Sequence, residues 1–345
     1  MSVFGAGSWG TALAILLSRN GTPVTLWGRD AAHIAELAEA RSNKKFLPGI
    51  PFPAALQVTA IAAQAMRDCD VQGRTSVAGG RTPGATDDCL IAVPSHAFRE
   101  TLTRLTPYLK PHTRIAWATK GLEPESGKLL HEVAEEIIGT RPTAVISGPT
   151  FAREVAAGSP TALTIASATP QFAADLAARL HSDTLRAYTS NDIIGVEVGG
   201  AVKNVLAIAA GIADGLGFGA NTRAALITRG LAEMMRLGIA LGGKRETFMG
   251  LAGLGDLVLT CTDDQSRNRR LGLALARGTP LADALRDIGQ IVEGVPTAGE
   301  IMRLAKTHGV EMPISEQVCR VLHEGKSPRA AVQSLLQREQ KAETI

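Results

Sequence analysis

The run GAGSWG at residues 5–10 constrains the fold of this 345-residue chain more than any other segment. It follows a short apolar strand and opens a helix, which is the context that a dinucleotide-binding turn requires. Gly5 permits the tight turn, Gly7 lets the backbone approach a pyrophosphate, and Gly10 lets the helix pack closely on the strand. Amide groups at the helix start then face the phosphates, with the helix dipole behind them. The run therefore predicts a dinucleotide-binding βαβ unit at the start of the chain.

The first half of the chain alternates short β-branched strands with helical stretches, the pattern of a parallel sheet covered by helices. Strands are expected at residues 2–4, 24–27, 56–59, 90–93, 114–118, 144–147, 162–166 and 185–188. From about Asn191 the strand signal disappears and the remainder is helical. We predict an α/β fold with an N-terminal doubly wound (Rossmann-type) dinucleotide-binding domain at residues 1–190. An all-helical C-terminal domain is expected at residues 191–345.

The composition narrows the class of protein. Hydrophobic residues make up 45% and charged residues 20%, as in an ordinary soluble globular protein. The net charge is only +3 and each long apolar stretch is interrupted by Gly, Lys, Glu or Arg, so neither nucleic acid binding nor membrane insertion is indicated. Four cysteines lie far apart without a Cys-x-x-Cys pair, which indicates reduced thiols and no metal site. No charged leader precedes the first strand, so we expect a cytoplasmic protein.

The end of the second expected strand bears on the choice between NAD and NADP. In NAD-binding domains an acidic residue about twenty positions beyond the glycines binds the ribose. Here the strand ends in Trp27-Gly28-Arg29-Asp30. Gly28 leaves space where an acid would repel a phosphate, Arg29 is able to meet a 2′-phosphate, and Asp30 can cap the next helix. The sequence mildly favours NADP(H) and leaves use of NAD(H) open.

Lys203 stands in the run at residues 195–211, where almost every other residue is apolar or glycine. The run predicts a buried helix with a close-packed glycine start. Burial disfavours the charged form of a lysine and brings its pKa toward neutrality. From this run alone two interpretations stay open. Lys203 is either catalytic or a structural lysine that snorkels to solvent or pairs with an acid such as Glu197.

Three further segments follow strands at the edge where open α/β sheets bind ligands. They are VPSH at residues 93–96, ATKGLE at residues 118–123 and SGPTFA at residues 147–152. Lys120 is placed either to reach a substrate oxygen or to remain a surface charge, and its position alone does not decide between these. His96 belongs more readily to the start of a helix than to catalysis, since no acid is paired with it.

The helical half carries a candidate anion-binding segment. Asp256 stands beside a glycine turn in the apolar run GLGDLVLTC at residues 253–261. The segment DQSRNRR at residues 264–270 then gathers guanidinium, hydroxyl and amide donors just before a helix expected at residues 271–277. Such donors near a helix start favour phosphate binding. A capped, solvated helix end with basic decoration is the structural alternative.

With these residues assembled, the chain resembles the bacterial NAD(P)-dependent glycerol-3-phosphate dehydrogenases. The motifs GAGSWG, VPSH, ATKGLE, ISGPTFA, GGAVKN, GLGDL and SRNR occur in the family's order over nearly the whole chain. The resemblance implies reversible hydride transfer between NADP(H) or NAD(H) and dihydroxyacetone phosphate, giving sn-glycerol 3-phosphate for glycerophospholipid synthesis. It also implies a doubly wound domain followed by a helical one, commonly as a homodimer.

The resemblance assigns roles to individual residues. Lys203 is the implied catalytic proton acceptor, and Lys120 and Asp256 are expected to orient the substrate and tune Lys203. The implied substrate-binding residues are Lys120, Gly148, Thr150, Lys203, Asn204, Asp256, Ser266, Arg267 and Asn268. Besides Gly5, Gly7 and Gly10 of the turn, the cofactor-binding residues that the resemblance implies are Ser8, Trp9, Arg29, Lys120, Ala152, Arg267, Ile291 and Glu293.

Two departures from the family pattern are visible. The Gly/Arg/Thr-rich stretch at residues 73–86 is longer than the usual connection before the fourth strand, and its composition predicts a surface loop. Only Met1 and Ser2 precede the buried part of the first strand, so we expect a few upstream residues to be missing or misassigned.

Two other functions compete with this interpretation. A dehydrogenase acting on a β-hydroxy acid would need a carboxylate-binding site, and the SRNR segment argues against it. A non-catalytic nucleotide sensor would have no use for Lys120, Lys203 and Asp256 together, and fold alone does not establish chemistry.

Overall fold

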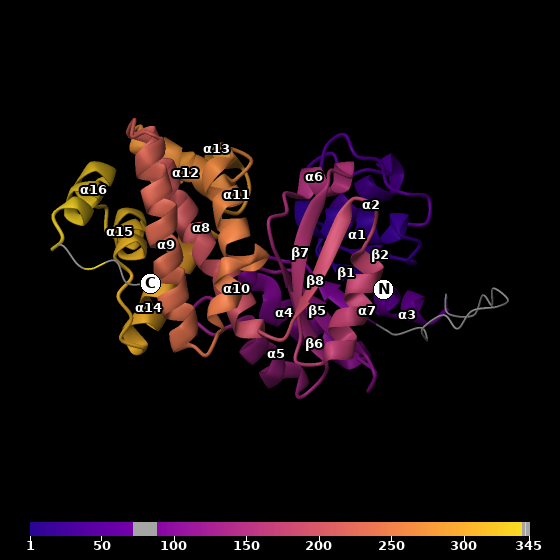
Figure 1. The fold of residues 1–345 in the computed structure, drawn as a ribbon. Coiled ribbons are helices and arrows are strands. Elements are labelled where there is room, and N and C mark those ends of the chain that lie inside the picture. Colours follow the sequence, from indigo (N-terminus) through magenta and orange to yellow (C-terminus); the bar gives the residue numbers. More distant parts are fainter. Residues whose placement is uncertain (72–87, 340–341, 343–345) are drawn as a thin grey trace. The chain divides into compact units, whose positions relative to one another are not determined.

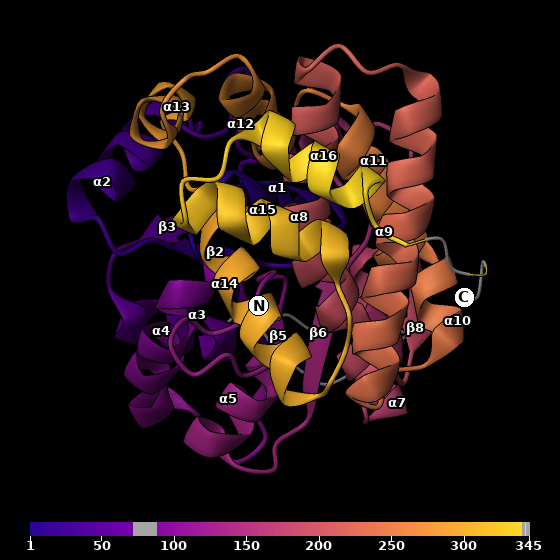
Figure 2. The ribbon, with the colours of Figure 1, turned by 90° about the vertical axis from the view of Figure 1, so that its left-hand side faces the viewer.

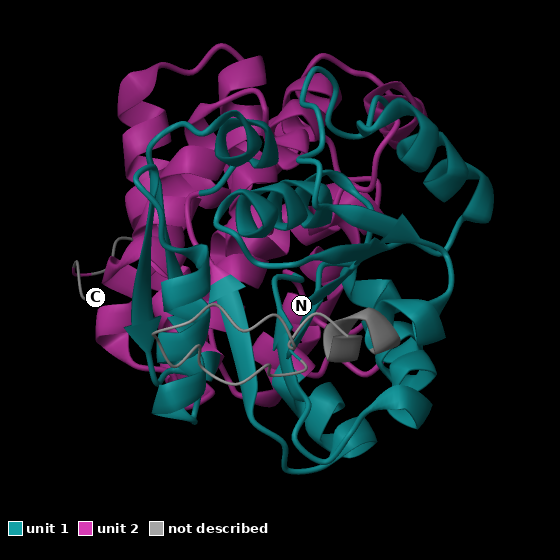
Figure 3. Ribbon diagram, turned by 90° about the vertical axis from the view of Figure 1, so that its right-hand side faces the viewer, with its two compact units in different colours: residues 1–119, 131–146, 150–193 teal, residues 120–130, 147–149, 194–345 magenta. Residues whose placement is uncertain are grey.

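The computed structural model describes residues 1–71, 88–339 and 342 (Figure 1). The stretch at residues 73–86 lies outside the described residues. Internal contacts divide the chain into two units, drawn in different colours in Figure 3. Unit 1 comprises residues 1–119, 131–146 and 150–193, and unit 2 comprises residues 120–130, 147–149 and 194–345. Two short segments from the first half of the chain thus belong to the helical unit.

Unit 1 is built on an eight-stranded sheet in the order β3-β2-β1-β4-β5-β6-β7-β8. Parallel pairs join β1 to β2 and β4, β2 to β3, β4 to β5, β5 to β6, and β7 to β8. The reversal of strand order between β1 and β4 is the switch point at which doubly wound sheets bind ligands. The strands are β1 (Ser2–Phe4), β2 (Thr25–Trp27), β3 (Gln57–Thr59), β4 (Asp88–Ile91), β5 (Arg114–Trp117), β6 (Thr143–Ser147), β7 (Thr161–Ala166) and β8 (Leu185–Ser190).

Helices of unit 1 connect these strands, and α1, α2, α6 and α7 share one apolar core with them. The Asp30 side chain caps α2, accepting hydrogen bonds from the amides of Ala32 at 3.0 Å and His33 at 3.2 Å. His96 lies in a short 3₁₀ turn that leads into α4. The helical elements are α1 (Ser8–Arg19), α2 (Ala31–Ala40), α3 (Ala62–Val71), η2 (Ser95–Ala97), α4 (Phe98–Leu105), η3 (Thr106–Tyr108), α5 (Leu130–Ile138), α6 (Ala152–Ala157) and α7 (Pro170–Leu180).

The predicted fold class is confirmed, and strand β4 shows why some boundaries were wrong. The sequence places this strand at residues 90–93, whereas it runs from Asp88 to Ile91. Asp88, the first residue of this strand, is charged and yet fully buried. Arg114 and Arg179 pair with its carboxylate at 2.7 and 2.5 Å. Partners from distant elements therefore let a charged residue begin a buried strand.

From residue 194 onward, the regular secondary structure of unit 2 is helical in the part that the structure describes. A π-helical turn, η4, interrupts the α-helices just before α11. The last three helices pack against one another in chain order (Figure 2). The elements are α8 (Ile193–Gly215), α9 (Ala220–Ala240), α10 (Arg245–Met249), η4 (Leu251–Gly255), α11 (Asp256–Thr262), α12 (Arg267–Ala276), α13 (Leu281–Ile288), α14 (Gly294–Thr307), α15 (Pro313–His323) and α16 (Pro328–Leu336).

Helix α8 forms the centre of unit 2. Every residue from Gly195 to Ala213 is buried. Among the described residues it is the one helix long and apolar enough to cross a membrane, yet 89% of its most apolar window is buried inside the protein. Its hydrophobic surface is covered by the other helices of the unit, so we interpret α8 as a core helix.

Candidate active site

The turn after β1 has the geometry of a cradle for a dinucleotide. Gly5 has a φ of +122°, and a Cβ added there would lie 2.5 Å from the Ala92 carbonyl oxygen. A Cβ at Gly10 would overlap the Gly5 carbonyl, whereas a Cβ at Gly7 would meet nothing within 4 Å. Packing therefore requires glycine at two positions, and the third faces open space that a phosphate group can enter.

Helix α1 begins at Ser8, so Ser8 and Trp9 lie in its first turn, where unpaired amides and the helix dipole favour an anion. The Trp9 indole Nε1 is buried and has no hydrogen-bond partner among the described residues. These residues fit the pyrophosphate of a dinucleotide.

At the end of β2, Gly28 is explained by packing rather than by space left for a phosphate. A Cβ at Gly28 would lie 2.7 Å from Ile34 Cδ1 and 3.0 Å from Ala6 Cβ, so close packing accounts for this glycine. Arg29 is highly exposed and lies 3.6 Å from the exposed carboxylate of Glu100. Exposed ion pairs of this kind are weak. The Arg29 guanidinium is therefore able to leave Glu100 for a stronger anion.

The SGPTFA segment is divided between the two units. In unit 1, Thr150 lies in the turn after β6 and Ala152 begins α6. In unit 2, Gly148 has a φ of +146°, and its carbonyl accepts a hydrogen bond from Lys120 Nζ at 3.2 Å.

Unit 2 brings Lys120, Lys203 and Asp256 together into what we call the Lys–Asp–Lys cluster. Lys203 Nζ donates to Asp256 Oδ1 at 2.6 Å, and Lys120 Nζ donates to Asp256 Oδ2 at 2.6 Å. One carboxylate thus bridges two ammonium groups from distant parts of the chain. The ion-pair partner of Lys203 is Asp256 rather than Glu197, which lies on the same helix.

Lys203 and Asp256 of the cluster are buried, and their surroundings shift the pKa of both groups. Lys203 is 7% exposed and Asp256 is 1% exposed. Burial lowers the pKa of Lys203 from 10.5 to about 8, although the Asp256 carboxylate opposes the shift. Burial alone would raise the pKa of Asp256, but the two lysines hold it below its usual range. The cluster therefore contains a permanent carboxylate and an amine that titrates near neutral pH.

The π-helical turn η4 positions Asp256. The sequence places Asp256 beside a glycine turn, whereas the structure makes it the first residue of α11, directly continuing η4. A Cβ at Gly199 of α8 would lie 2.5 Å from the Ala252 carbonyl oxygen, so η4 presses against the backbone of α8. The glycine start of α8 therefore allows the approach that places Asp256 beside Lys203. π-Helical turns are frequent at functional sites.

Thr260 is a member of the site that the sequence analysis missed. Its hydroxyl accepts a hydrogen bond from Lys203 Nζ at 2.9 Å and donates to the Asp256 carbonyl oxygen at 2.6 Å. The signal that could have identified it is its spacing, because residues four apart share one face of a helix. The apolar run at residues 253–261 gave no reason to single out this hydroxyl.

Ser266, Arg267 and Asn268, which we call the anion site, lie at the start of α12. The helix begins at Arg267, so its expected start at residue 271 was wrong. The reason is that the polar run RNRR lacks the apolar period by which a helix is recognised. The Ser266 hydroxyl caps the helix by accepting from the Arg269 amide at 3.2 Å, and Arg267 Nη1 donates to Gln290 Oε1 at 3.3 Å.

Asn268 joins three elements of unit 2. Its Nδ2 donates to Asn204 Oδ1 on α8 at 3.0 Å, and its Oδ1 accepts from the Gly294 amide at 2.9 Å. Gly294 begins α14 and follows Glu293, while Ile291 is exposed just before it. The predicted residues 291 and 293 thus lie on a segment that is bonded to the anion site.

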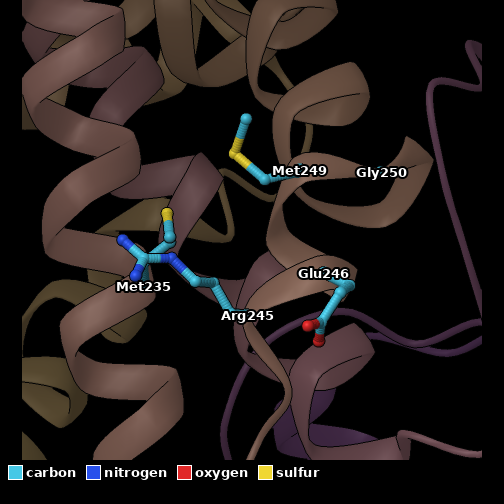
Figure 4. Close-up of a pocket in the computed structure, with 5 residues that line it drawn as sticks. All are labelled: Met235, Arg245, Glu246, Met249 and Gly250. Atoms are coloured by element: carbon cyan, nitrogen blue, oxygen red, sulfur yellow. The ribbon is translucent and has the colours of Figure 1, made fainter. Parts of the chain in front are cut away.

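A surface cavity lies elsewhere in unit 2 (Figure 4). Its volume is about 460 Å³, and its lining residues come from α9, α10 and the following turn: Met235, Arg245, Glu246, Met249 and Gly250. None of the predicted site residues lines it. The buried ion-paired cluster, not this cavity, therefore defines the candidate site.

The chemistry of these groups defines a class of protein. A buried lysine with a pKa of about 8 is suited to exchange a proton with an alcohol near neutral pH. Combined with a dinucleotide-binding unit, this proton exchange is the chemistry of an NAD(P)-dependent dehydrogenase.

Comparison with known proteins identifies the family within this class. The chain matches the models for the NAD-dependent glycerol-3-phosphate dehydrogenase N-terminus at residues 1–72 and 81–173, and C-terminus at residues 192–333. The glycerol-3-phosphate dehydrogenase [NAD(P)+] of Aeromonas hydrophila is 56% identical over 99% of this chain and 98% of its own length. That of Nitrosococcus oceani is 57% identical over 99% of this chain and 94% of its own length.

A solved structure agrees with this result. The crystal structure of glycerol-3-phosphate dehydrogenase from Coxiella burnetii superposes with a TM-score of 0.90 at 50% identity, covering 98% of each chain. The chain belongs to the NAD-dependent glycerol-3-phosphate dehydrogenase family. The resemblance drawn from the sequence motifs is confirmed, and the sensor and β-hydroxy acid alternatives are set aside.

Proposed function

We propose that the enzyme catalyses reversible hydride transfer between NAD(P)H and dihydroxyacetone phosphate, giving sn-glycerol 3-phosphate for glycerophospholipid synthesis. The observation that carries the proposal is the buried Lys–Asp–Lys cluster in the same unit as the anion site. The names of relatives that are more than half identical over nearly the whole chain support this substrate.

In the proposed mechanism Lys203 exchanges the proton of the C2 oxygen. As a neutral amine it accepts the alcohol proton during oxidation, and as an ammonium it returns a proton to the carbonyl oxygen during reduction. A pKa of about 8 lets both forms be populated at working pH. Hydrogen bonds to Asp256 and Thr260 hold the Lys203 nitrogen in place. Lys120 would orient the reacting oxygen from the other side of Asp256.

The anion site would bind the substrate phosphate. The half-buried Arg267 supplies a cation. Burial lowers its pKa and Glu293 opposes that shift, but an arginine starts far above neutral pH and stays protonated. Ser266 and Asn268 add hydroxyl and amide groups. Gly148, Thr150 and Asn204 are proposed to contact the glycerol backbone. Holding a remote phosphate helps to align the reacting carbon, so part of the binding energy is expressed in catalysis.

The cofactor is proposed to lie along the glycine turn of unit 1. Gly7 would let the backbone approach the pyrophosphate, Gly5 and Gly10 allow the turn and the close packing of α1, and Ser8 and Trp9 lie at the helix start. When bound, the nicotinamide ring supplies or accepts the hydride. Arg29 would meet a 2′-phosphate and so favour NADPH over NADH. The remaining proposed cofactor contacts are Lys120, Ala152, Arg267, Ile291 and Glu293.

We also propose how the enzyme is organised in the cell. Residues 1–190 would bind the cofactor, and residues 191–345 would bind the substrate and carry out catalysis. The enzyme would be a cytoplasmic homodimer that acts on a small-molecule substrate. A net charge of +3 without a long basic run gives no reason to expect nucleic acid binding. The use of α8 as a core helix gives no reason to expect membrane insertion. Sedimentation analysis of the purified enzyme tests the dimer.

The decisive experiment follows the loss of reduced-nicotinamide absorbance in the purified enzyme. Dihydroxyacetone phosphate is compared with unphosphorylated dihydroxyacetone, each with NADPH and with NADH. We expect oxidation of the cofactor that depends on the substrate phosphate. Cofactor binding without turnover of the phosphorylated substrate would exclude the proposed reaction, and the ratio of the two cofactor rates tests the role of Arg29.

A further inference from the structure

Helices α8 and α12 touch backbone to backbone. A Cβ added at Gly211 of α8 would overlap the Arg269 carbonyl and lie 3.0 Å from Gly272 Cα. A Cβ added at Gly272 of α12 would overlap the Ile208 carbonyl and lie 2.8 Å from the Ile212 nitrogen. No side chain fits between the helices at this crossing. The distance between the two backbones is therefore set by main-chain atoms, which cannot move aside as a flexible side chain can.

An ion pair locks the same crossing against rotation and sliding. The Asp214 carboxylate on α8 accepts a hydrogen bond from Arg269 Nη1 on α12. Arg269 is 8% exposed, and its Nε donates to Asp264 Oδ1 at 2.9 Å, just before the helix. A buried guanidinium held by two carboxylates has a fixed direction. The ion pair lies next to the glycine contact, since Asp214 and Gly211 are neighbours on α8.

The two helices carry the two halves of the proposed site. Lys203 lies on α8 eight residues before Gly211, which corresponds to roughly 12 Å along the helix. Arg267 lies in the first turn of α12, two residues before Arg269. The bond from Asn268 to Asn204 links the same helices near Lys203. A shift of α12 against α8 would consequently change the separation between the proton-transfer group and the anion site.

We propose that Gly211, Gly272, Asp214 and Arg269 are positioning residues that fix the distance from Arg267 to Lys203. They do not touch substrate. They convert phosphate binding into alignment of the C2 carbon, because a phosphate held at the wrong distance would pull the carbonyl away from Lys203. This proposal rests on the proposed function. It adds the residues that match the spacing between Lys203 and Arg267 to the length of the substrate.

The test compares the whole substrate with its two parts, dihydroxyacetone and inorganic phosphate, measured separately. Only the whole substrate depends on the distance between Lys203 and Arg267. Gly272→Ala inserts a methyl group into the helix crossing. We expect kcat/KM for dihydroxyacetone phosphate to fall about 10- to 100-fold, the effect of a displacement near 1 Å. By contrast, kcat/KM for unphosphorylated dihydroxyacetone and the inhibition constant for inorganic phosphate should each stay within about twofold, because each part still finds its own site.

Matched controls distinguish positioning from general damage. Gly299→Ala is the control for the glycine change, since Gly299 lies within α14 and an added Cβ there meets nothing within 4 Å. It should leave all three measurements unchanged. If Gly272→Ala does not fold, Asp214→Asn tests the ion pair. Its control is Arg223→Gln, because Arg223 bonds Asp214 at 2.8 Å from α9 and not from α12.

The outcomes are distinct. A fall in kcat/KM that is confined to dihydroxyacetone phosphate supports the proposal. Arg269→Ala should show the same fall, and Arg269→Lys should show a smaller one. Parallel losses for dihydroxyacetone, inorganic phosphate and the whole substrate would show a structural role and overturn it. The proposal would also be overturned if both Gly272→Ala and Asp214→Asn left all three measurements unchanged. A wild-type enzyme inactive on dihydroxyacetone phosphate would instead refute the proposed function, and that measurement is made first.

Discussion

Oxidation of sn-glycerol 3-phosphate should depend on pH through the titration of Lys203. The pKa of Lys203 is lowered to about 8 by burial. A proton acceptor must be neutral, so kcat/KM for oxidation should rise by about tenfold per pH unit below pH 8 and level off above it. In the reductive direction the ammonium is the active form, so kcat/KM should fall through the same pH. The two profiles are mirror images because one group serves both directions.

Asp256→Asn sharpens this prediction because it keeps the side-chain size and removes the charge. The carboxylate favours the ammonium form of Lys203, so its loss should lower that pKa further. An opposite charge at hydrogen-bond distance shifts a pKa by about 1–3 units, which places the new value at roughly 5–7. The variant leaves two lysines without their shared buried counter-charge, at a cost of about 3–5 kcal/mol in the free energy of unfolding.

The assay is the initial rate of cofactor reduction across pH at constant ionic strength, with thermal unfolding measured in parallel. Asp283→Asn is the matched control, because Asp283 pairs with Arg286 on an exposed part of α13. Its profile should keep the inflection near 8. An inflection that also stays near 8 in Asp256→Asn would refute the reasoning, since the titrating group would then not be the lysine that Asp256 holds.

Four further predictions concern single residues. Lys203→Ala should fold and bind cofactor but lose at least about 100-fold in kcat; near-normal turnover would rule out Lys203 as the proton acceptor. Arg267→Ala should reduce kcat/KM for dihydroxyacetone phosphate but not for dihydroxyacetone, and an unchanged efficiency with the phosphorylated substrate would remove Arg267 from the anion site. Arg29→Gln should lower kcat/KM with NADPH by about 10- to 100-fold, the loss of one charge-assisted bond, and leave NADH unaffected; equal effects on both cofactors would contradict a 2′-phosphate contact. Asp30→Ala should lower the free energy of unfolding by about 1 kcal/mol through loss of the α2 cap, measured by denaturant titration.

Features that depend on neighbouring residues could be predicted from the sequence. The turn at residues 5–10 is a local structure, since strand, glycines and helix follow one another directly. The burial of Lys203 also follows from its own helix, because the surrounding apolar residues leave no polar face to expose. For the same reason Asp30 could be recognised as a helix cap.

Features that depend on distant residues could not be predicted in this way. Asp256 is 53 positions from Lys203, and nothing in either segment indicates which acid the lysine meets. The spacing of Thr260 from Asp256 places both on one face of α11, but its contact with Lys203 depends on how α11 packs against α8. Asp88 illustrates the same limit in unit 1, because its burial depends on Arg179 at a separation of 91 positions. Partner choice is a property of the tertiary fold.

The charge of the Lys–Asp–Lys cluster explains why the buried Lys203 and Asp256 lie together with the half-buried Lys120. With Lys203 neutral, the Lys120 ammonium and the Asp256 carboxylate balance, so the buried site carries no net charge. Protonation of Lys203 adds one positive charge, which burial resists and Asp256 partly compensates. A single lysine with its own carboxylate would be held as an ammonium, and a buried lysine without any carboxylate would lose its proton far below neutral pH. Sharing one carboxylate between two lysines gives Lys203 a pKa between these two extremes. Proton exchange with an alcohol near neutral pH requires such an intermediate pKa.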